Sequence, residues 1–252
     1  MRFDGTVLIT GASAGIGEAC ARAFAAAGAR LVLTARRADR LERLAGELRE
    51  AHGTESTALP LDVRDGEGVR AALGALPTVD VLVANAGLGR GLAPLHEGDP
   101  EEWDEMLDTN VMGVLHTLRA VVPGMVERGR GHVIDIGSVA GHEVYPGGAV
   151  YCATKHALGA ITRGLRMDLL GTGVRVSTVD PGMVETEFSV VRFRGDRERA
   201  DRVYRDMTPL TAADVADAVL WVATRPPHVN IDQIVIKPTD QASATLVHRR
   251  GG

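Results

Sequence analysis

The chain has 252 residues, of which 45% are hydrophobic and 24% are charged. This composition is ordinary for a soluble globular protein, so it excludes fibrous and largely disordered classes. The 33 Asp and Glu residues outnumber the 28 Lys and Arg residues, which gives a formal net charge of −5. Because the arginines are scattered between acids and form no basic stripe, we expect no nucleic-acid partner.

Cysteine and histidine spacing offers neither a disulfide framework nor a metal centre. Cys20 and Cys152 both fall in predicted helices, and the eight histidines include no His-x-x-x-His pair. The N-terminus enters a short strand at once, without the apolar core of a signal peptide, and no apolar run is long enough to span a bilayer. We therefore expect a cytoplasmic chain without a metal that acts on a small molecule away from the membrane.

Short apolar runs rich in β-branched residues alternate with segments of helical period from end to end. The runs that predict strands are residues 6–10, 30–34, 56–59, 79–83, 132–136, 174–179 and 231–236. The segments that predict helices are residues 16–27, 38–51, 66–75, 101–127, 150–170 and 212–224. Such alternation predicts parallel strands joined by helices on both faces. The expected fold class is α/β, a doubly wound parallel seven-stranded sheet of the Rossmann type, in a single domain over residues 1–252.

One long stretch, residues 183–210, has no clean period and follows the sixth predicted strand. A connection at this point lies at the carboxyl edge of the sheet, where ligands bind in such folds. We predict that it forms a substrate lid. The alternative is a surface excursion with no part in binding.

A glycine-rich turn joins the first predicted strand to the first predicted helix. In this position Gly11 permits a tight turn, Gly15 lets backbone amides approach a pyrophosphate, and Gly17 lets the helix pack on the strand. The turn therefore predicts a dinucleotide site. The residues of the turn that we expect to bind the cofactor are Gly11, Ser13, Gly15, Ile16 and Gly17.

The second predicted strand is followed by Arg36 and Arg37, with no acidic residue at this point. A site that recognises a ribose 2′-hydroxyl has an acid here, whereas guanidinium groups grip a 2′-phosphate through paired hydrogen bonds. The sequence therefore predicts NADP(H) in preference to NAD(H). The alternative is that both arginines lie at the exposed start of a helix and pair with Asp39 or Glu42.

Tyr151 and Lys155 lie one turn apart in the predicted helix 150–170, and Ser138 follows the fifth predicted strand. Lowering the pKa of a tyrosine from about 10 to about 7 takes about 4 kcal/mol, roughly what one ammonium about 4 Å away supplies at an effective dielectric of about 20. Tyr151 would then exchange a proton with a carbonyl or alcohol oxygen, and Ser138 would hydrogen-bond the same oxygen. Taken alone, Tyr-x-x-x-Lys also fits an ordinary amphipathic helix.

With these motifs in place, the chain resembles the short-chain dehydrogenase/reductase family over essentially its full length. The matching residues stand in the family's order: Gly11, Gly15, Gly17, Leu61, Asp62, Val63, Asn85, Ala86, Gly87, Asn110, Ser138, Tyr151, Lys155, Pro181 and Gly182. The resemblance implies reversible hydride transfer between NADP(H) and a carbon that bears an alcohol or a carbonyl. It implies that Ser138 orients the oxygen while Tyr151 exchanges the proton. Asn110 would join a water-mediated proton relay to Lys155.

The resemblance also implies further cofactor contacts. The residues concerned are Asp62 and Val63 at the adenine, Asn85, Ala86 and Gly87 beneath the cofactor, and Pro181, Gly182, Val184 and Thr186 at the nicotinamide. Lys155 would also hold the nicotinamide ribose hydroxyls. In isolation, Asp62 also fits a turn cap, Asn85 a turn residue and Asn110 a helix breaker.

Within the family, several segments are similar to the NADP-dependent 3-hydroxy acid dehydrogenases, which act on serine, allo-threonine and 3-hydroxypropionate-type substrates. These segments are residues 125–128, 145–148, 186–189, 191–196, 228–232 and 235–249. The last of them is also similar to clavulanate-type aldehyde reductases. Gly89-Arg90-Gly91 and Cys152 depart from the pattern of the branch.

The resemblance to this branch leaves the substrate open. A 3-hydroxy acid needs a cation for its carboxylate, and the candidates by charge are Arg90, Arg192 and Arg194. The alternatives are an NADPH-dependent carbonyl reductase for a bulkier ketone or aldehyde and a non-catalytic NADP-binding sensor. Relatives pair long helices across subunits, so the resemblance implies a homotetramer with a further interface along the C-terminal tail, residues 237–252.

Overall fold

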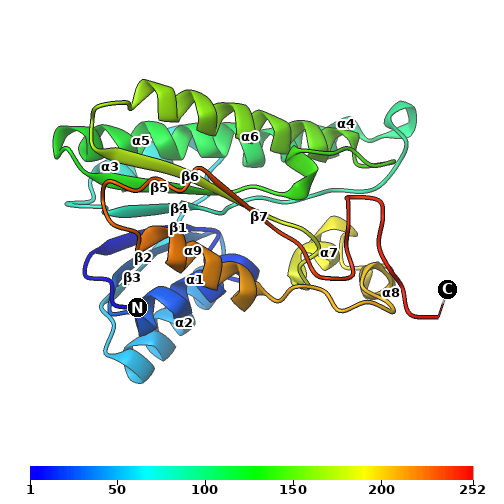
Figure 1. Cartoon of the computed structure of the whole chain (residues 1–252), viewed down its shortest axis with the longest axis horizontal. Helices are drawn as coiled ribbons and strands as arrows, with labels where there is room; N and C mark the ends of the chain where they lie inside the picture. The colour runs from blue at the N-terminus through cyan, green and yellow to red at the C-terminus, as the bar shows by residue number, and fades with distance from the viewer. Residues whose placement is uncertain (252) are drawn as a thin grey trace.

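All seven predicted strands form one parallel sheet in the computed structural model, which describes residues 1–251 (Figure 1). The strand order is β3-β2-β1-β4-β5-β6-β7, and every neighbouring pair is parallel. The strands are β1 (Thr6–Thr10), β2 (Arg30–Ala35), β3 (Ser56–Pro60), β4 (Val81–Ala84), β5 (Gly131–Ile136), β6 (Val174–Pro181) and β7 (Gln233–Ile236). The predicted α/β class and doubly wound sheet are confirmed.

Helices cover both faces of the sheet (Figure 1). One face carries α1 (Gly15–Ala26), α2 (Ala38–His52) and α9 (Ala212–Ala223). The other carries α3 (Gly66–Gly74), α4 (Pro100–Leu107), α5 (Gly113–Glu127) and α6 (Ala149–Asp168). Successive residues of a strand point to opposite faces, so Leu8 belongs to one core layer and Ile9 to the other. Burial on both faces explains why continuous apolar runs, and not alternation, marked the strands.

The helix predicted over residues 101–127 is present, but it is not one uninterrupted α-helix. α4 and α5 are separated by a π-helical turn, Asp108–Met112, with Asn110 buried at its centre. The Asn110 amide donates to the Leu88 carbonyl oxygen and accepts from the Leu88 N–H, both at 2.8 Å. Its Nδ2 also lies 3.1 Å from Thr154 Oγ1. The helix widens where this side chain holds the loop after β4, and such single π-helical turns are frequent at functional sites.

The stretch predicted to be irregular contains two short helices, α7 (Glu187–Arg192) and α8 (Arg197–Val203). Each has a side-chain N-cap: the Thr186 hydroxyl accepts from the Phe188 N–H, and the Asp196 carboxylate accepts from the Arg199 N–H. Helices of six and seven residues are too short to show a period in the sequence. Both lie beyond the carboxyl ends of the strands, at the right of Figure 1.

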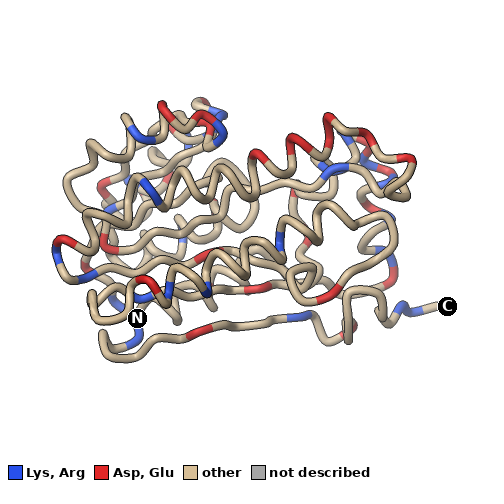
Figure 2. The backbone as a smooth tube through the Cα atoms, turned by 90° about the horizontal axis from the view of Figure 1, so that it is seen from above, with Lys and Arg blue, Asp and Glu red and all other residues tan. Residues whose placement is uncertain are grey.

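Charged residues of both signs are interspersed along the chain (Figure 2). No helix within residues 1–251 is long and apolar enough to cross a membrane. Both cysteines are buried. Some apolar side chains stay exposed, among them Met167 on α6 and Leu170 just after it.

Candidate active site

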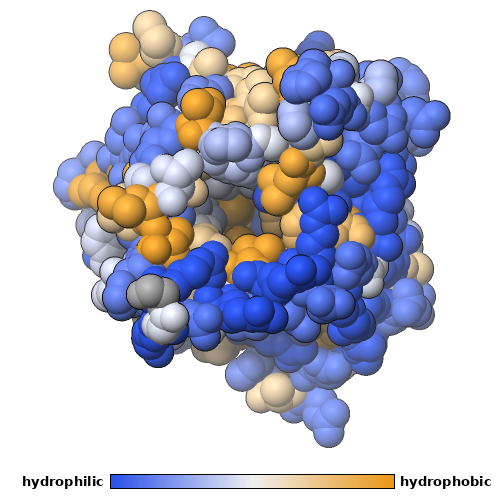
Figure 3. All heavy atoms as spheres, turned by 90° about the vertical axis from the view of Figure 1, so that its right-hand side faces the viewer, coloured by the Kyte–Doolittle hydropathy of each residue, from blue (hydrophilic) through white to orange (hydrophobic). Residues whose placement is uncertain are grey.

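A cavity of about 560 Å³ opens at the carboxyl ends of the strands. Figure 3 shows it as a hollow in the face that carries α7 and α8, with apolar side chains near its mouth and hydrophilic ones around them. The order of the strands reverses between β1 and β4. Ligands of open α/β sheets bind at such a switch point, so the cavity lies where the fold predicts a binding site.

Most of the predicted site residues line this cavity. They are Gly11, Ser13, Gly15, Ile16, Arg36, Arg37, Asp62, Val63, Asn85, Ala86, Gly87, Ser138, Tyr151, Lys155, Pro181, Gly182, Val184, Thr186 and Arg192. Four of the predicted site residues, all within the described chain, lie outside the lining: Gly17, Arg90, Asn110 and Arg194. The folded chain therefore brings together residues from seven separate segments at one edge of the sheet.

The glycine-rich turn between β1 and α1 has the backbone that its sequence suggests. Gly11 and Gly15 have φ angles of 68° and 58°, a left-handed region that favours glycine. A Cβ at Gly17 would collide with the Gly11 carbonyl oxygen, so the start of α1 packs directly on the turn. Asn85 Nδ2 donates to the Thr10 carbonyl oxygen at 2.9 Å and braces the turn from β4.

The arginines after β2 pair with neither Asp39 nor Glu42, the partners of the alternative interpretation, among the described contacts. Arg37 Nη1 lies 2.9 Å from Glu187 Oε2, and its Nε donates to Ser13 Oγ at 3.1 Å. Arg40 Nη1 lies 2.8 Å from Glu187 Oε1. Burial raises the pKa of Glu187, but the hydrogen bonds from both arginines outweigh it and hold that pKa below its ordinary value.

Lys155 lies on α6 with its ammonium group buried against β5. Its Nζ donates to the Ile136 carbonyl oxygen at 2.9 Å. Burial lowers the pKa of Lys155 to about 8, and the carboxylates of Asp180 and Asp135 oppose this change. Lys155 is therefore still mostly a cation at neutral pH.

Tyr151 differs from the expectation that its pKa would be lowered by Lys155. Burial raises the pKa of Tyr151, and the Arg192 guanidinium and the Ser138 hydroxyl oppose the rise. The phenol is enclosed because the Tyr151 ring packs against Phe188, with ring centroids 5.5 Å apart. The nearby cation that offsets its burial is Arg192, on the lid.

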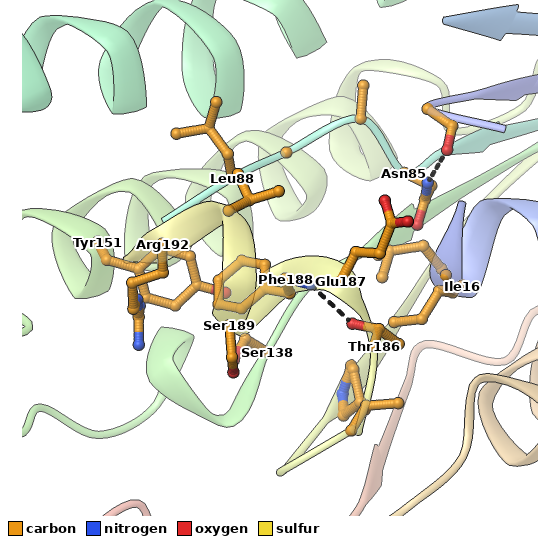
Figure 4. A pocket seen from close by; sticks show the side chains of 18 of the residues that line it. Ile16, Asn85, Leu88, Ser138, Tyr151, Thr186, Glu187, Phe188, Ser189 and Arg192 are labelled. Atoms are coloured by element: carbon orange, nitrogen blue, oxygen red, sulfur yellow. Dashed lines mark hydrogen bonds between the residues drawn. The ribbon is translucent and has the colours of Figure 1, made fainter. Parts of the chain in front are cut away.

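Arg192 is surrounded by aromatic rings (Figure 4). Its guanidinium carbon lies 4.8 Å from the ring centroid of Tyr151 and 5.0 Å from that of Phe188. Arg192 Nη2 donates to the Tyr145 hydroxyl at 3.0 Å. Its Nε is buried and has no hydrogen-bond partner among the described residues. Nε lies against Gly89, while Arg192 as a whole lines the cavity and places a cation beside the tyrosine.

The other two candidate arginines are engaged with acids of α4. Arg90 forms a bidentate pair with Glu105, at 2.6 and 2.8 Å, and its Nη1 donates to the Val191 carbonyl oxygen. Arg194 Nε lies 3.0 Å from Glu102 Oε1. These arginines join α4 to α7 and to the residues just after it, which leaves Arg192 as the candidate that lines the cavity.

Tyr145, Glu187 and Tyr204 also line the cavity, although no sequence motif predicts a role for them. The Tyr204 hydroxyl donates to the Val184 carbonyl oxygen at 2.8 Å and supports the lid from within. These residues lie in a loop or at an end of a short helix, so no period or spacing marks them. Only the resemblance of segments 145–148 and 186–189 to one branch pointed to two of them.

A doubly wound sheet with a glycine-rich turn at its switch point is the architecture of dinucleotide-binding enzymes. A family model described as short chain dehydrogenase matches residues 5–196. The chain belongs to the short-chain dehydrogenase family and is an oxidoreductase of that family. The family resemblance found in the sequence is confirmed.

Relatives and solved structures match the chain over nearly its full length. The NADP-dependent 3-hydroxy acid dehydrogenase YdfG of Salmonella typhi is 48% identical over 249 residues, which are 96% of this chain and 99% of the relative. An uncharacterised oxidoreductase of Mycobacterium tuberculosis is 53% identical over 238 residues, which are 94% of this chain and 92% of the relative. The closed form of a serine dehydrogenase complexed with NADP+ has a TM-score of 0.90 and 45% identity, covering 97% of this chain and 100% of that one.

Proposed function

We propose that the protein is an NADP(H)-dependent dehydrogenase that transfers a hydride between NADP(H) and the hydroxyl-bearing carbon of a small 3-hydroxy acid, of the serine, allo-threonine or 3-hydroxypropionate type. The observation that carries the proposal is Arg192, a cation that lines the cavity with its guanidinium carbon 4.8 Å from the centroid of the Tyr151 ring. The similarity to an NADP-dependent 3-hydroxy acid dehydrogenase and to a serine dehydrogenase supports it.

The residues present fit the cofactor. The left-handed Gly11 and Gly15 bring backbone amides at the start of α1 to the surface of the cavity, which suits a pyrophosphate. Arg36 and Arg37 line the same cavity and suit a 2′-phosphate. When bound, the nicotinamide supplies the hydride in reduction and accepts it in oxidation.

We assign to Tyr151 the transfer of the proton to and from the substrate oxygen. Because burial raises its pKa, the phenol is protonated at neutral pH and is ready to donate to a carbonyl oxygen during reduction. Ser138 hydrogen-bonds the same oxygen, and the Lys155 cation stabilises the phenolate that forms. Asn110 contacts Thr154, next to Lys155 in sequence, which supports its predicted place in a relay to that lysine.

The carboxylate of the substrate is assigned to Arg192. A guanidinium forms short, charge-assisted hydrogen bonds to a carboxylate, and Arg192 lines the cavity. The three aromatic side chains around Arg192 limit its motion, so its guanidinium group is held in one orientation before the substrate binds. Arg90 and Arg194 keep their partners on α4 and help to hold the lid in place.

A carbonyl reductase for a bulkier ketone or aldehyde is a second candidate. Tyr145, Phe188 and Tyr204 all line the cavity, and such aromatic walls also suit a larger apolar group. A non-catalytic sensor has less support, because Ser138, Tyr151 and Lys155 line one cavity as a complete proton-transfer set.

Initial rates test the proposal. NADPH absorbance is followed with a 3-oxo acid, with the matched 3-oxo amide and with a bulky ketone, and the first substrate is repeated with NADH. We expect NADPH to be preferred and the acid to exceed its amide by about 10- to 100-fold in kcat/KM, which corresponds to about 1.5–3 kcal/mol for a hydrogen bond to a charged group. Equal rates for acid and amide would contradict the carboxylate assignment, and saturable reduction confined to the bulky ketone would favour the second candidate.

The homotetramer, the tail interface and the cytoplasmic location are parts of the same proposal. Exposed apolar side chains support subunit contacts, with Leu115 and Val126 on α5, Met167 on α6 and Leu246 in the tail. Light scattering on the purified protein is expected to give the mass of four chains. A monomer at micromolar concentration would contradict it.

A further inference from the structure

We propose that Glu187 fastens the lid over the bound cofactor by bridging Arg37 and Arg40, and that this bridge slows the release of NADP(H). The inference rests on the proposed cofactor site and deepens it. It gives Glu187 the role of a positioning residue, which acts on the cofactor through the lid and not by touching the reacting atoms.

The bridge joins two elements that are distant in sequence. Glu187 is the first residue of α7, Arg37 is the N-cap residue of α2, and Arg40 lies in the first turn of α2. Glu187 Oε2 lies 2.9 Å from Arg37 Nη1, while Arg40 Nη1 lies 2.8 Å from Oε1 and 2.9 Å from Oε2 of the same carboxylate. One carboxylate on the lid thus links it to the opposite wall of the cavity.

The bridge lies along the path that the cofactor must take. Thr186 faces the glycine-rich turn so closely that a Cβ placed on Gly15 would lie 3.3 Å from the Thr186 Cβ. Figure 4 shows Glu187 toward Ile16 and Phe188 toward Tyr151. A dinucleotide with its 2′-phosphate at Arg37 and its nicotinamide near Tyr151 therefore passes under the segment that Glu187 anchors.

Arg37 has two potential anionic partners, Glu187 and the 2′-phosphate. Arg40 lies outside the cavity lining, and its guanidinium donates to both carboxylate oxygens of Glu187. When Arg37 turns toward the phosphate, Arg40 therefore retains the carboxylate and the lid stays fastened. α7 also carries Phe188 and Arg192, so the same bridge fixes the helix that presents the substrate arginine.

The test is the dissociation rate of the cofactor, measured by stopped-flow fluorescence of NADPH displaced by excess NADP+. The variants are E187Q, R40M and the double variant. We expect each single variant to release NADPH about fivefold faster and the double variant to add little, because both changes break one interaction. In E187Q, NADH release should rise by a similar factor, since the bridge is a contact between protein groups. Melting temperatures confirm that each variant is folded.

A matched control is E47Q. Glu47 also pairs with two arginines, Arg22 and Arg43, and its side chain is 42% exposed against 46% for Glu187, but it lies away from the cavity. Its release rates should equal those of the wild type. An unchanged NADPH release rate in E187Q would overturn the bridge. E187Q that binds NADPH more tightly than the wild type, but not NADH, would also overturn it, because Glu187 would then compete with the 2′-phosphate for Arg37. A wild-type protein that binds no NADPH would instead overturn the proposed cofactor, and the bridge with it.

Discussion

The guanidinium carbon of Arg192 lies 4.8 Å from the centroid of the Tyr151 ring. The same cation opposes the rise in the pKa of Tyr151 and lines the cavity. A carboxylate bound to Arg192 would neutralise its charge, so the pKa of Tyr151 would rise further. Binding of an acidic substrate would then keep the phenol protonated for the reduction step.

Replacing Arg192 by Met tests its assignment to the substrate carboxylate. We expect kcat/KM for a 3-oxo acid to fall about 10- to 100-fold, since a hydrogen bond to a charged group contributes about 1.5–3 kcal/mol. The matched amide should change little. Arg194→Met serves as the control, because Arg194 pairs with Glu102 and lies outside the cavity lining. Equal losses for acid and amide would mean that Arg192 only supports the lid.

Replacing Tyr151 by Phe removes the proton donor while keeping the ring that packs on Phe188. We expect turnover to fall at least 100-fold, as general acid catalysis contributes about 10²- to 10⁴-fold. NADPH binding, followed by fluorescence titration, should stay close to that of the wild type. Tyr204→Phe is the control: it removes a cavity hydroxyl that donates to Val184, and it should affect turnover far less. A near-normal rate in the Tyr151 variant would refute its role.

The charge of Lys155 predicts a pH dependence. Its pKa is about 8 because burial lowers it, so its cation is present below that pH and is lost above it. Asp180 opposes this lowering and is held by His142 at 2.7 Å. Asp180→Asn therefore lowers the pKa of Lys155 further. We expect the reduction rate of the wild type to decline above about pH 8 and the decline in the variant to begin at lower pH.

The pH profile of kcat/KM in the reduction direction checks this expectation. Glu67→Gln, which removes a surface carboxylate paired only with Arg70 among the described contacts, should leave the profile unchanged. If the pH profiles of Asp180→Asn and the wild type coincide, the ionisation of Lys155 does not cause the decline in rate at high pH.

The parts of the molecule that depend on local sequence could be predicted. The strands follow from apolar runs buried on both faces, and the turn before α1 follows from Gly11, Gly15 and Gly17. The π-helical turn could not be predicted, because it depends on the contact of Asn110 with the backbone of Leu88, 22 residues away. The orientation of Arg192 depends on rings from two other elements, Tyr145 and Tyr151.

Electrostatic balance was the least predictable property of the site. The sequence places Lys155 one turn from Tyr151, which suggests that the lysine lowers the pKa of the phenol. The fold instead binds the Lys155 ammonium to the Ile136 carbonyl oxygen and buries the phenol, so desolvation prevails. Burial and the direction of a side chain are set by tertiary packing, and spacing along a helix does not contain them.

Asp135 predicts how the stability of the fold depends on pH. The carboxyl is fully buried on β5, accepts from Thr162 Oγ1 at 2.6 Å through Oδ2, and has no partner for Oδ1 among the described residues. Burial raises its pKa to about 6 from 3.8. Because the folded state holds this proton more tightly than the unfolded state, the group's contribution to stability is complete below pH 3.8 and is lost as pH rises through about 6.

Asp135→Asn removes that loss and keeps an acceptor for Thr162. We expect its free energy of unfolding, relative to that of the wild type, to increase by up to about 3 kcal/mol between about pH 4 and pH 7. Thr162→Val should act in the opposite direction. Without the Thr162 hydroxyl the pKa of Asp135 rises further, so this variant should lose more stability between the two pH values than the wild type does. Urea unfolding of the three proteins across this pH range measures both effects. A difference between Asp135→Asn and the wild type that does not change with pH would mean that the Asp135 carboxylate is already compensated in the folded chain, with the Lys155 cation as the group that does so.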